Sequence, residues 1–486
     1  MALTIKMNDG GFNISSGINL AYVTTGTTGV YKFRYLVEAT YHLENYTTPV
    51  SRTISFTQQQ NQSGGAVFNL SEIYQSIVTP MIYKDRYENP PSSTIQGQYG
   101  SIHTLPALQG ADPDAFIFSS GLMTDSNGRE AFRGNANVMT LKFYEMYSTT
   151  ADGIPVKQTA GTGSDEKTIF MMWGRGHENE GVIIDFDDYV FDGTSKKLLS
   201  SNYNLSGGKY QVNLGADDYH TIAFLNKCEI NTSSSPYKIY INFRRYDGAS
   251  IGNMTILNVA NAGGKYDDTL DDERFFLFMG IGIPNLNKMD GSAEYTGNLP
   301  SDLVGITHYD VVVKNDATPS AEVSDTYRFN LVTPCEKYEV SRLAFMNRFG
   351  AWEYMNLNKE KTSELKVERN YVTKPLINQS IGLAQWIDEH INVAYPLDVA
   401  KQGKMTTSVK SEESFTLFTD NLEPSEIEQI KDMMMSPQIH LLDGENAKAL
   451  ILETANMKLK GDKNTGLYNY ELKFKYASPK YRQTLS

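Results

Sequence analysis

The chain contains a long series of short runs in which aromatic and β-branched residues alternate with polar ones, separated by turns rich in glycine and asparagine. Aromatic and β-branched side chains fit the half-buried surface of a pleated sheet, whereas glycine and asparagine favour tight turns. Closely spaced strands without an internal repeat of fixed period predict a mainly β protein, with β-sandwich or jelly-roll-like modules rather than a propeller or a solenoid. The clearest runs are residues 138–147, 167–173, 181–191, 219–225, 237–246, 253–259, 274–281, 308–315 and 326–333.

The 486-residue chain is too long for a single hydrophobic core, so we expect several β domains with a few short helices. Residues 81–114 are rich in proline, glycine and serine. This composition predicts an irregular arm or loop, because it does not sustain a strand ladder. The predicted segments are an N-terminal β module, the arm, a central β-sandwich-like domain and a C-terminal β domain, at 1–80, 81–114, 115–334 and 335–486.

Three segments predict individual elements. A short helix is expected over residues 68–78, and a second near 424–436, where proline stands close to the first turn and again just past the end. In residues 31–43 alternate side chains share one face of a strand, as the two-residue period of a sheet requires. These side chains are Phe33, Tyr35, Val37, Ala39 and Tyr41.

An excess of acidic residues gives the chain a formal net charge of −13. An acidic surface repels phosphate groups, so we expect no direct, sequence-specific nucleic-acid partner. No run approaches the roughly 20 apolar residues of a membrane span, and residues 1–11 lack a secretion signal, so we expect no membrane partner and synthesis in a cytoplasm. The two cysteines, Cys228 and Cys335, are too few for a disulfide scaffold or a cysteine zinc site.

Two blocks of the sequence resemble a known family. The N-terminal block comprises the strand at 31–43 and the helix entry at 67–73, and the C-terminal block comprises Cys335 and residues 343–357, 434–441 and 467–478. Together they resemble structural virion proteins of tailed bacteriophages that infect Bacteroidetes-type bacteria, including crAss-like phages. The resemblance implies a tail, baseplate or neck protein of the virion, made in the host cytoplasm. It also implies a ring or sleeve built with other copies of the chain and with other virion proteins.

A turn in the C-terminal block is the main candidate for packing or assembly. It contains Asn347, Arg348, Phe349, Gly350 and Trp352. A glycine beside aromatic residues suits a tight turn between two strands whose flanks pack on a neighbouring surface. That surface belongs either to the same domain, with a buried tryptophan, or to another subunit.

Acidic residues supply the only candidate metal sites and catalytic groups. On a predicted strand, Asp185 and Asp187 share a face and could bind a cation or act as an acid–base pair. The alternative is a solvated strand face. Asp267 and Asp271 lie in a predicted loop without the spacing of a calcium loop, which indicates either a solvated acidic turn or a weak cation site.

A polar segment around Trp173, Arg175 and His177 is either a recognition loop or an ordinary surface turn. The sequence lacks a nucleophile elbow, a phosphate-binding glycine loop and a zinc signature, so no cofactor is expected.

Three functions remain open at this point. The first is a non-enzymatic structural protein that acts by oligomeric assembly. The second is a receptor- or carbohydrate-binding protein of a phage tail, with exposed aromatic residues stacking on sugars. The third is a polysaccharide-degrading hydrolase that uses two of the acidic residues named above.

Overall fold

The chain folds mainly into β-sheets. The computed structural model describes residues 3–7, 12–14, 19–43, 50–78, 103, 118–119, 136–158, 166–175, 186–190, 196–201, 203–204, 209–225, 238–257, 276–287, 295–297, 305–315, 319–332, 338–373, 404–419, 422, 424–444, 446–454, 470–477 and 481–484. Strands dominate these residues and short helices accompany them, which confirms the mainly β prediction. The finer expectation of β-sandwich or jelly-roll-like modules stays a prediction.

Two sheets pack face to face in the N-terminal part of the chain. The smaller sheet has the order β1 (Thr4–Lys6), β3 (Leu20–Thr24) and β6 (Gly65–Asn69). The larger has the order β2 (Phe12–Ile14), β10 (Glu166–Met172), β8 (Ala136–Ser148), β4 (Tyr31–Leu43) and β5 (Val50–Gln59), with β9 (Val156–Lys157) beside β8. Apolar side chains from both sheets, together with helix α1 (Ser71–Ile77), form one core.

The predicted apolar face of residues 31–43 is the buried face of β4. Tyr35, Val37, Ala39 and Tyr41 are buried in the core between the two sheets, and Phe33 packs against its margin. The boundary predicted between residues 114 and 115 differs from the observed pairing. Strands β8 and β10 belong to the same sheet as β4, because β4 and β8 pair along most of their length. Residues 81–114 lie outside the described part of the chain, apart from His103.

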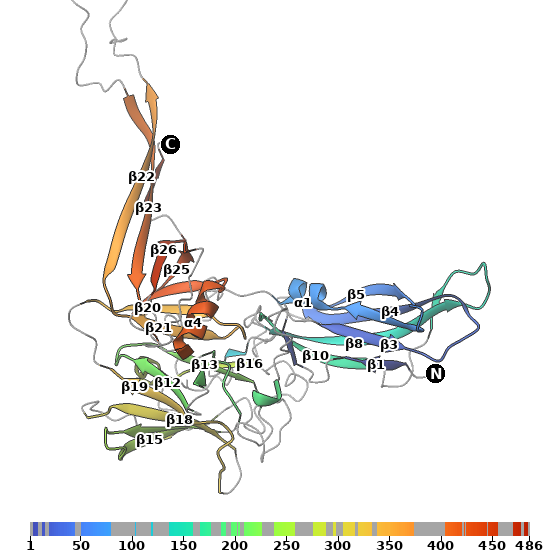
Figure 1. Ribbon diagram of the computed structural model, residues 1–486, viewed down its shortest axis with the longest axis horizontal. Helices are drawn as coiled ribbons and strands as arrows, with labels where there is room; N and C mark the ends of the chain where they lie inside the picture. Colours follow the sequence, from blue (N-terminus) through green and yellow to red (C-terminus); the bar gives the residue numbers. More distant parts are fainter. Residues whose placement is uncertain are drawn as a thin grey trace, which may run out of the picture.

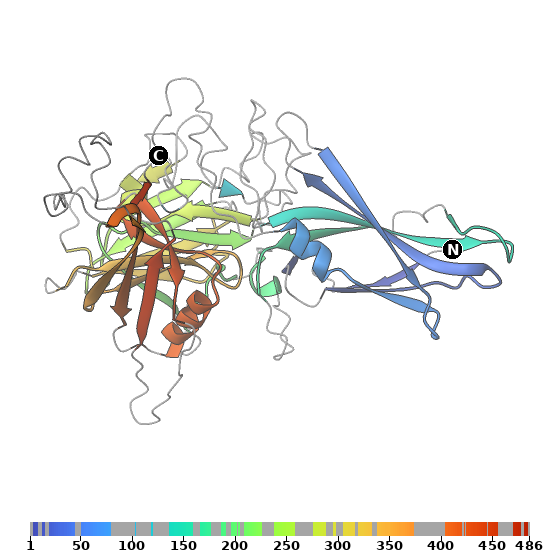
Figure 2. The same ribbon diagram turned by 90° about the horizontal axis from the view of Figure 1, so that it is seen from above.

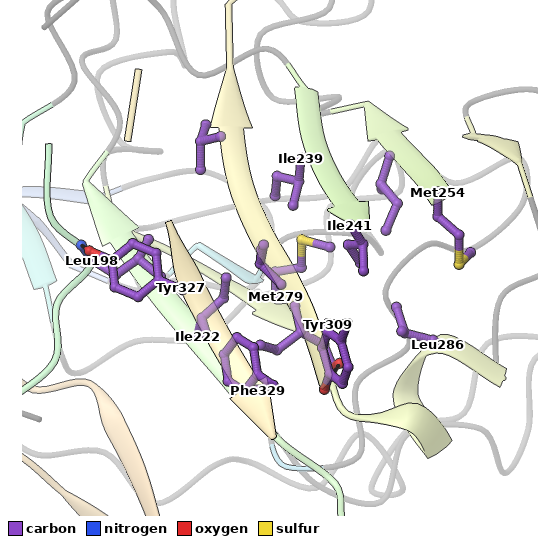
Figure 3. Close-up of a cluster of buried hydrophobic side chains, with 14 of the residues drawn as sticks. Leu198, Ile222, Ile239, Ile241, Met254, Met279, Leu286, Tyr309, Tyr327 and Phe329 are labelled. Carbon is purple, nitrogen blue, oxygen red and sulfur yellow. Dashed lines mark hydrogen bonds between the residues drawn. The ribbon is translucent and has the colours of Figure 1, made fainter. Parts of the chain in front are cut away.

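The central part of the chain contains a second pair of packed sheets. The larger has the order β11 (Tyr203–Asn204), β12 (Lys209–Leu214), β19 (Tyr327–Leu331), β18 (His308–Lys314), β14 (Lys238–Arg244), β15 (Ser250–Leu257) and β17 (Tyr295–Gly297). The smaller has the order β13 (Thr221–Leu225), β16 (Phe276–Gly280) and β7 (Phe118–Ser119). Figure 3 shows the core between them, where Ile239, Ile241, Met254 and Ile222 surround Tyr309 and Phe329, together with Leu286 of helix α2 (Ile283–Asn287).

The C-terminal part forms one large antiparallel sheet. Its order is β21 (Trp352–Leu357), β20 (Ser341–Met346), β24 (Ile439–Asp443), β25 (Asn446–Leu452), β26 (Glu471–Tyr476), β23 (Lys404–Phe418) and β22 (Lys361–Thr373), with β27 (Tyr481–Thr484) beside β23. Helix α4 (Pro424–Met434) buries Ile430 and Met433 against one face of this sheet. In Figure 1 the hairpin of β22 and β23 projects away from the body, and β4, β5 and β8 project in another direction.

One predicted strand contains a 3₁₀ helix in its described part, and one helix is shorter than predicted. Within residues 181–191, which we expected to form a strand, Phe186–Asp188 form a 3₁₀ helix. The N–H groups of Tyr189 and Val190 both donate to the carbonyl of Phe186, 2.9 Å away, so the backbone turns locally here, and of the described residues in this run only Val190 forms an isolated parallel bridge, with Leu225 of β13. The helix expected over 68–78 begins at Ser71, because Phe68 belongs to β6. Among the helices of the described residues, none has the length and hydropathy needed to span a membrane.

Candidate assembly site

Three of the sheets meet at one buried region, which we call the junction. It brings together the end of β10, strands β13 and β16, and the face of β20 and β21 opposite helix α4. Its buried apolar side chains include Ile14, Met172, Leu225, Phe276, Phe278, Met346, Phe349, Trp352 and Tyr354. Figure 2 shows the N-terminal sheets on one side of this region and the central and C-terminal sheets on the other. The N-terminal module is therefore packed onto the rest of the chain.

The candidate packing turn lies inside the junction. The side-chain Oδ1 of Asn347 accepts hydrogen bonds from the N–H groups of Phe349 at 2.9 Å and Ala351 at 3.0 Å, which closes the turn between β20 and β21. Gly350 has a φ of +78°, and a Cβ there would lie 2.5 Å from the carbonyl oxygen of Trp173. Trp352 is only 4% exposed. The contacts of this turn are thus with other sheets of the same chain.

An ion-pair cluster holds the end of β10 against this turn. Arg348 Nε lies 3.1 Å from Oδ2 of Asp432, whose side chain is fully buried on α4. Arg175 Nη2 donates to the carbonyl of Asp432 at 3.0 Å, and the N–H of Arg175 donates to the carbonyl of Arg348 at 2.9 Å. Trp173, beside them, packs against both the junction and the N-terminal core. Two members of the predicted recognition loop therefore contact the interior of the chain, and His177 lies outside the described residues.

A buried carboxyl group ties the same turn to a neighbouring segment. Glu353 accepts hydrogen bonds from Ser200 Oγ and Ser201 Oγ at 2.8 Å, and from Asn347 Nδ2 at 3.0 Å and Gln429 Nε2 at 3.1 Å. Burial raises the pKa of Glu353, which these hydrogen bonds partly offset. The side chain is closed off from solvent and saturated with protein donors, which is typical of a structural carboxyl group rather than a catalytic one.

A chain of buried hydrogen bonds crosses the junction. His103 Nε2 lies 2.9 Å from Nδ1 of His440, and His103 Nδ1 lies 3.0 Å from the hydroxyl of Tyr354. That hydroxyl lies 2.5 Å from Oγ1 of Thr221 on β13. Burial lowers the pKa of His440 to about 4 and lowers the pKa of His103 well below its usual value, so both rings are neutral at pH 7.

A buried arginine completes the polar part of the junction. Arg342 on β20 donates to the carbonyl of Tyr219 at 2.7 and 3.0 Å, to Oδ1 of Asn356 at 2.7 Å and to Oδ2 of Asp218 at 3.2 Å. His220 Nδ1 lies 3.2 Å from Arg342 Nη2, and burial together with this cation lowers the pKa of His220. The arginine thereby fixes the start of β13 to the C-terminal sheet.

Sequence analysis did not identify the histidine and arginine contacts. Positions 103, 220, 342 and 440 are far apart in the sequence and follow no ligand spacing. His103 stands in a stretch of sequence without periodic apolar residues. Nothing in the sequence therefore indicates that it is buried or that it contacts His440. By contrast, the aromatic turn at 347–352 did indicate a packing site.

The described residues do not test the proposed cation ligands as a group. Asp185, Asp267 and Asp271 lie outside the described residues, and Asp187 is in the 3₁₀ helix that replaces the predicted strand. The shared strand face inferred for Asp185 and Asp187 therefore does not apply. Within the described ranges, no group of three or more histidine, cysteine or acidic side chains is arranged to hold a metal ion.

The hairpin of β22 and β23, which we call the hairpin arm, is the most exposed β-structure of the C-terminal sheet. The two strands pair from Lys361 and Leu417 near the body to Thr373 and Lys404 at the far end. Strands β26 and β27 cover parts of β23 on its other side. No strand of the described chain pairs with the outer edge of β22.

The hairpin arm also exposes large apolar side chains. On β22, Leu365 is 56%, Tyr371 58% and Val372 43% exposed. An open strand edge offers a row of unpaired backbone donors and acceptors, and natural proteins usually cover, shorten or bend such edges. A long, regular and partly apolar edge is consistent with a surface that a further strand covers in the assembled state.

Comparison with known proteins adds no assignment. No protein-family model matches the chain, and no curated protein matches it at a significant level. The resemblance to tailed-phage virion proteins therefore rests on the sequence blocks described above and stays a prediction. The functional argument rests on the geometry of the junction and the hairpin arm.

Proposed function

We propose that this chain is a non-enzymatic structural protein that acts by assembling with further copies of itself or with partner chains. The open outer edge of β22 is the observation that carries this proposal. A thirteen-residue strand presents backbone hydrogen-bonding groups over roughly 40 Å, which suits strand addition by another chain. The sequence resemblance supports the further proposal that this assembly belongs to the virion of a tailed bacteriophage, in the tail, baseplate or neck.

The junction supports this role. A subunit of a large assembly has to transmit geometry from one contact surface to another, which requires domains that do not move freely. Here apolar packing and the hydrogen bonds of Arg175, just after β10, connect the N-terminal sheets to the C-terminal sheet that carries the hairpin arm. The buried carboxyl group of Glu353 accepts hydrogen bonds from neighbouring segments of the chain. This favours a structural role of Glu353 over a hydrolytic one.

The first test is the molar mass of the full-length protein in solution, measured by light scattering over a range of concentrations. It is combined with electron cryomicroscopy of intact particles. We expect concentration-dependent oligomers and a symmetric multi-copy density in the tail, baseplate or neck. A protein that stays monomeric at every concentration and is absent from particles would refute the proposal.

A matched pair of variants tests whether the hairpin arm is the contact surface. Leu365→Thr keeps a β-forming residue on the arm but removes an exposed apolar side chain, and Ile154→Thr makes the same kind of change at an exposed site in the N-terminal module. We expect the first variant to weaken association and the second to leave it unchanged. Equal effects of both variants would argue against the arm.

A further inference from the structure

We infer that β22 pairs antiparallel with β22 of a second copy of this chain, with Val367 opposite Val367. This inference rests on the proposed assembly function and names the partner and the register. It joins the two C-terminal sheets into one continuous sheet about a twofold axis, which is an isologous interface.

The outer edge of β22 is regular enough for such pairing. The register between β22 and β23 shifts between Asn370 and Tyr371, whose partners are Ser408 and Thr406. The extra residue, Thr407, therefore belongs to β23, and β22 is uninterrupted. In an antiparallel pair, the N–H and C=O groups of alternate residues point away from the partner strand. Half of the residues of β22 thus direct both groups toward the open edge.

The charges of β22 are self-complementary about Val367. Lys366 and Glu368 flank this residue, so twofold pairing places each lysine opposite the second copy's glutamate. Lys361 then faces Thr373, and all thirteen residues of the strand find a partner. Opposite charges on facing residues stabilise a strand pair, whereas like charges directly opposite destabilise it.

Neighbouring twofold registers bring like charges together. A centre at residue 364, 366, 368 or 369 places Glu364, Lys366, Glu368 or Arg369 opposite itself. A centre at residue 365 places Lys361 opposite Arg369. Among centres from 364 to 369, only residue 367 avoids every such pair. The charge pattern therefore selects the register that also uses the whole strand.

The side chains on the arm fit the same arrangement. Lys366 Nζ and Glu368 Oε1 already form an ion pair at 2.9 Å within one chain, and both side chains are largely exposed. Twofold pairing extends this contact to four alternating charges on one face of the sheet. On the other face, exposed Leu365 lies beside the aliphatic part of the second copy's Arg369, so apolar surface is covered as well.

Charge-reversal variants of the full-length protein test this register. Lys366→Glu and Glu368→Lys each create two like-charge contacts across the twofold axis, and we expect each to weaken self-association about tenfold or more. An equimolar mixture of the two variants places opposite charges at both contacts, so it should regain wild-type affinity as a heterodimer. The double variant K366E/E368K should regain it as well. Sedimentation velocity measures all four samples.

Lys410→Glu is the matched control. Residue 410 lies opposite Glu368 on the inner strand β23, so this change disturbs charges within the hairpin but not across the open edge. We expect its self-association to equal that of the wild type. If the wild type self-associates but the mixture associates as weakly as each single variant, the inferred register is overturned and the proposed assembly function stands. A wild type that is monomeric alone yet present in particles overturns it in favour of a strand from a different protein.

Cross-linking provides a second measurement. Directly opposed Cα atoms in an antiparallel pair lie roughly 4.5–5.5 Å apart, which suits a disulfide. In a background with both native cysteines replaced by serine, Val367→Cys should yield a covalent dimer under mild oxidation. Val372 is more exposed than Val367 on the same strand but lies opposite Thr362, so Val372→Cys should not. The reverse result would overturn the register.

Discussion

Acidification should weaken the junction, and His440→Asn should remove part of that effect. His440 is buried and its pKa is lowered to about 4, whereas in the unfolded chain it titrates near 6.5. Below pH 6.5 the unfolded state therefore binds one more proton than the folded state. The stability that His440 contributes is complete above pH 6.5 and is lost as the pH falls toward 4. Asparagine can place a polar atom close to the position of Nδ1, so the contact with His103 is retained.

The size of the effect follows from proton linkage. Each pH unit between 6.5 and 4 costs about 1.4 kcal/mol per histidine, so His440 alone lowers the free energy of unfolding by about 2 kcal/mol at pH 5. The pKa values of His103 and His220 are lowered in the same sense, mainly by burial; His440 and then Arg342 lower that of His103 further, and Arg342 lowers that of His220 further. Glu353, whose pKa burial raises, acts in the opposite sense. His220 and Glu353 are common to both proteins and cancel, to first order, in the difference between them. Replacing His440 also removes one cause of the lowered pKa of His103, which adds to the difference in the same direction.

Guanidinium unfolding of wild type and His440→Asn at several pH values between 7.5 and 5 measures this difference. We expect the wild type to lose more stability than the variant on acidification, by about 2 kcal/mol at pH 5. The two proteins should show the same pH dependence above pH 7. Parallel curves over the whole range would refute the assignment of a buried, neutral His440.

Two further variants test the junction by thermal or chemical unfolding. Gly350→Ala should lower the free energy of unfolding by more than about 2 kcal/mol, because its Cβ would collide with the carbonyl of Trp173 at a left-handed backbone position. Gly444→Ala is the control: Gly444 is also left-handed but faces open space, so this change should cost about 1 kcal/mol. Equal losses would show that the contact with Trp173 is unimportant. Asp432→Asn should cost about 3 kcal/mol, because it removes the buried carboxylate that pairs with both Arg348 and Arg175 and leaves Arg348 only its half-exposed partner Glu428, and a loss below 1 kcal/mol would contradict this.

Periodicity predicted most strands because local alternation is visible in a single sequence. The buried face of residues 31–43 is one example, and the strands at 341–346 and 352–357 are another. The same criterion failed at Phe186–Asp188, where two adjacent aspartates favour a local turn although apolar residues stand on both sides. The partnership of β4 with β8 depends on a contact between distant segments, which no periodicity records.

The candidate assembly surface was only partly predictable. Residues 361–373 carry charged side chains on both faces of the strand, which indicates a strand that leaves the core, and the structure has this strand exposed along its length. Its great length and its position at the edge depend on how the whole C-terminal sheet is ordered. The contacts of the junction histidines could not be predicted, because hydrogen bonds between distant segments do not change the local composition of the sequence.

The contact between His103 and His440 also has a consequence for biosynthesis. These residues are 337 positions apart in the sequence, so the N-terminal partner leaves the ribosome long before the other exists. At ~5–20 residues per second the interval is roughly 20 to 70 seconds. For most of this time β20, β21 and α4 are absent too, and the packing surface of the N-terminal module has no cover. We expect the nascent chain to depend on chaperones in this interval, and to acquire its final geometry only when translation of the C-terminal sheet is almost complete.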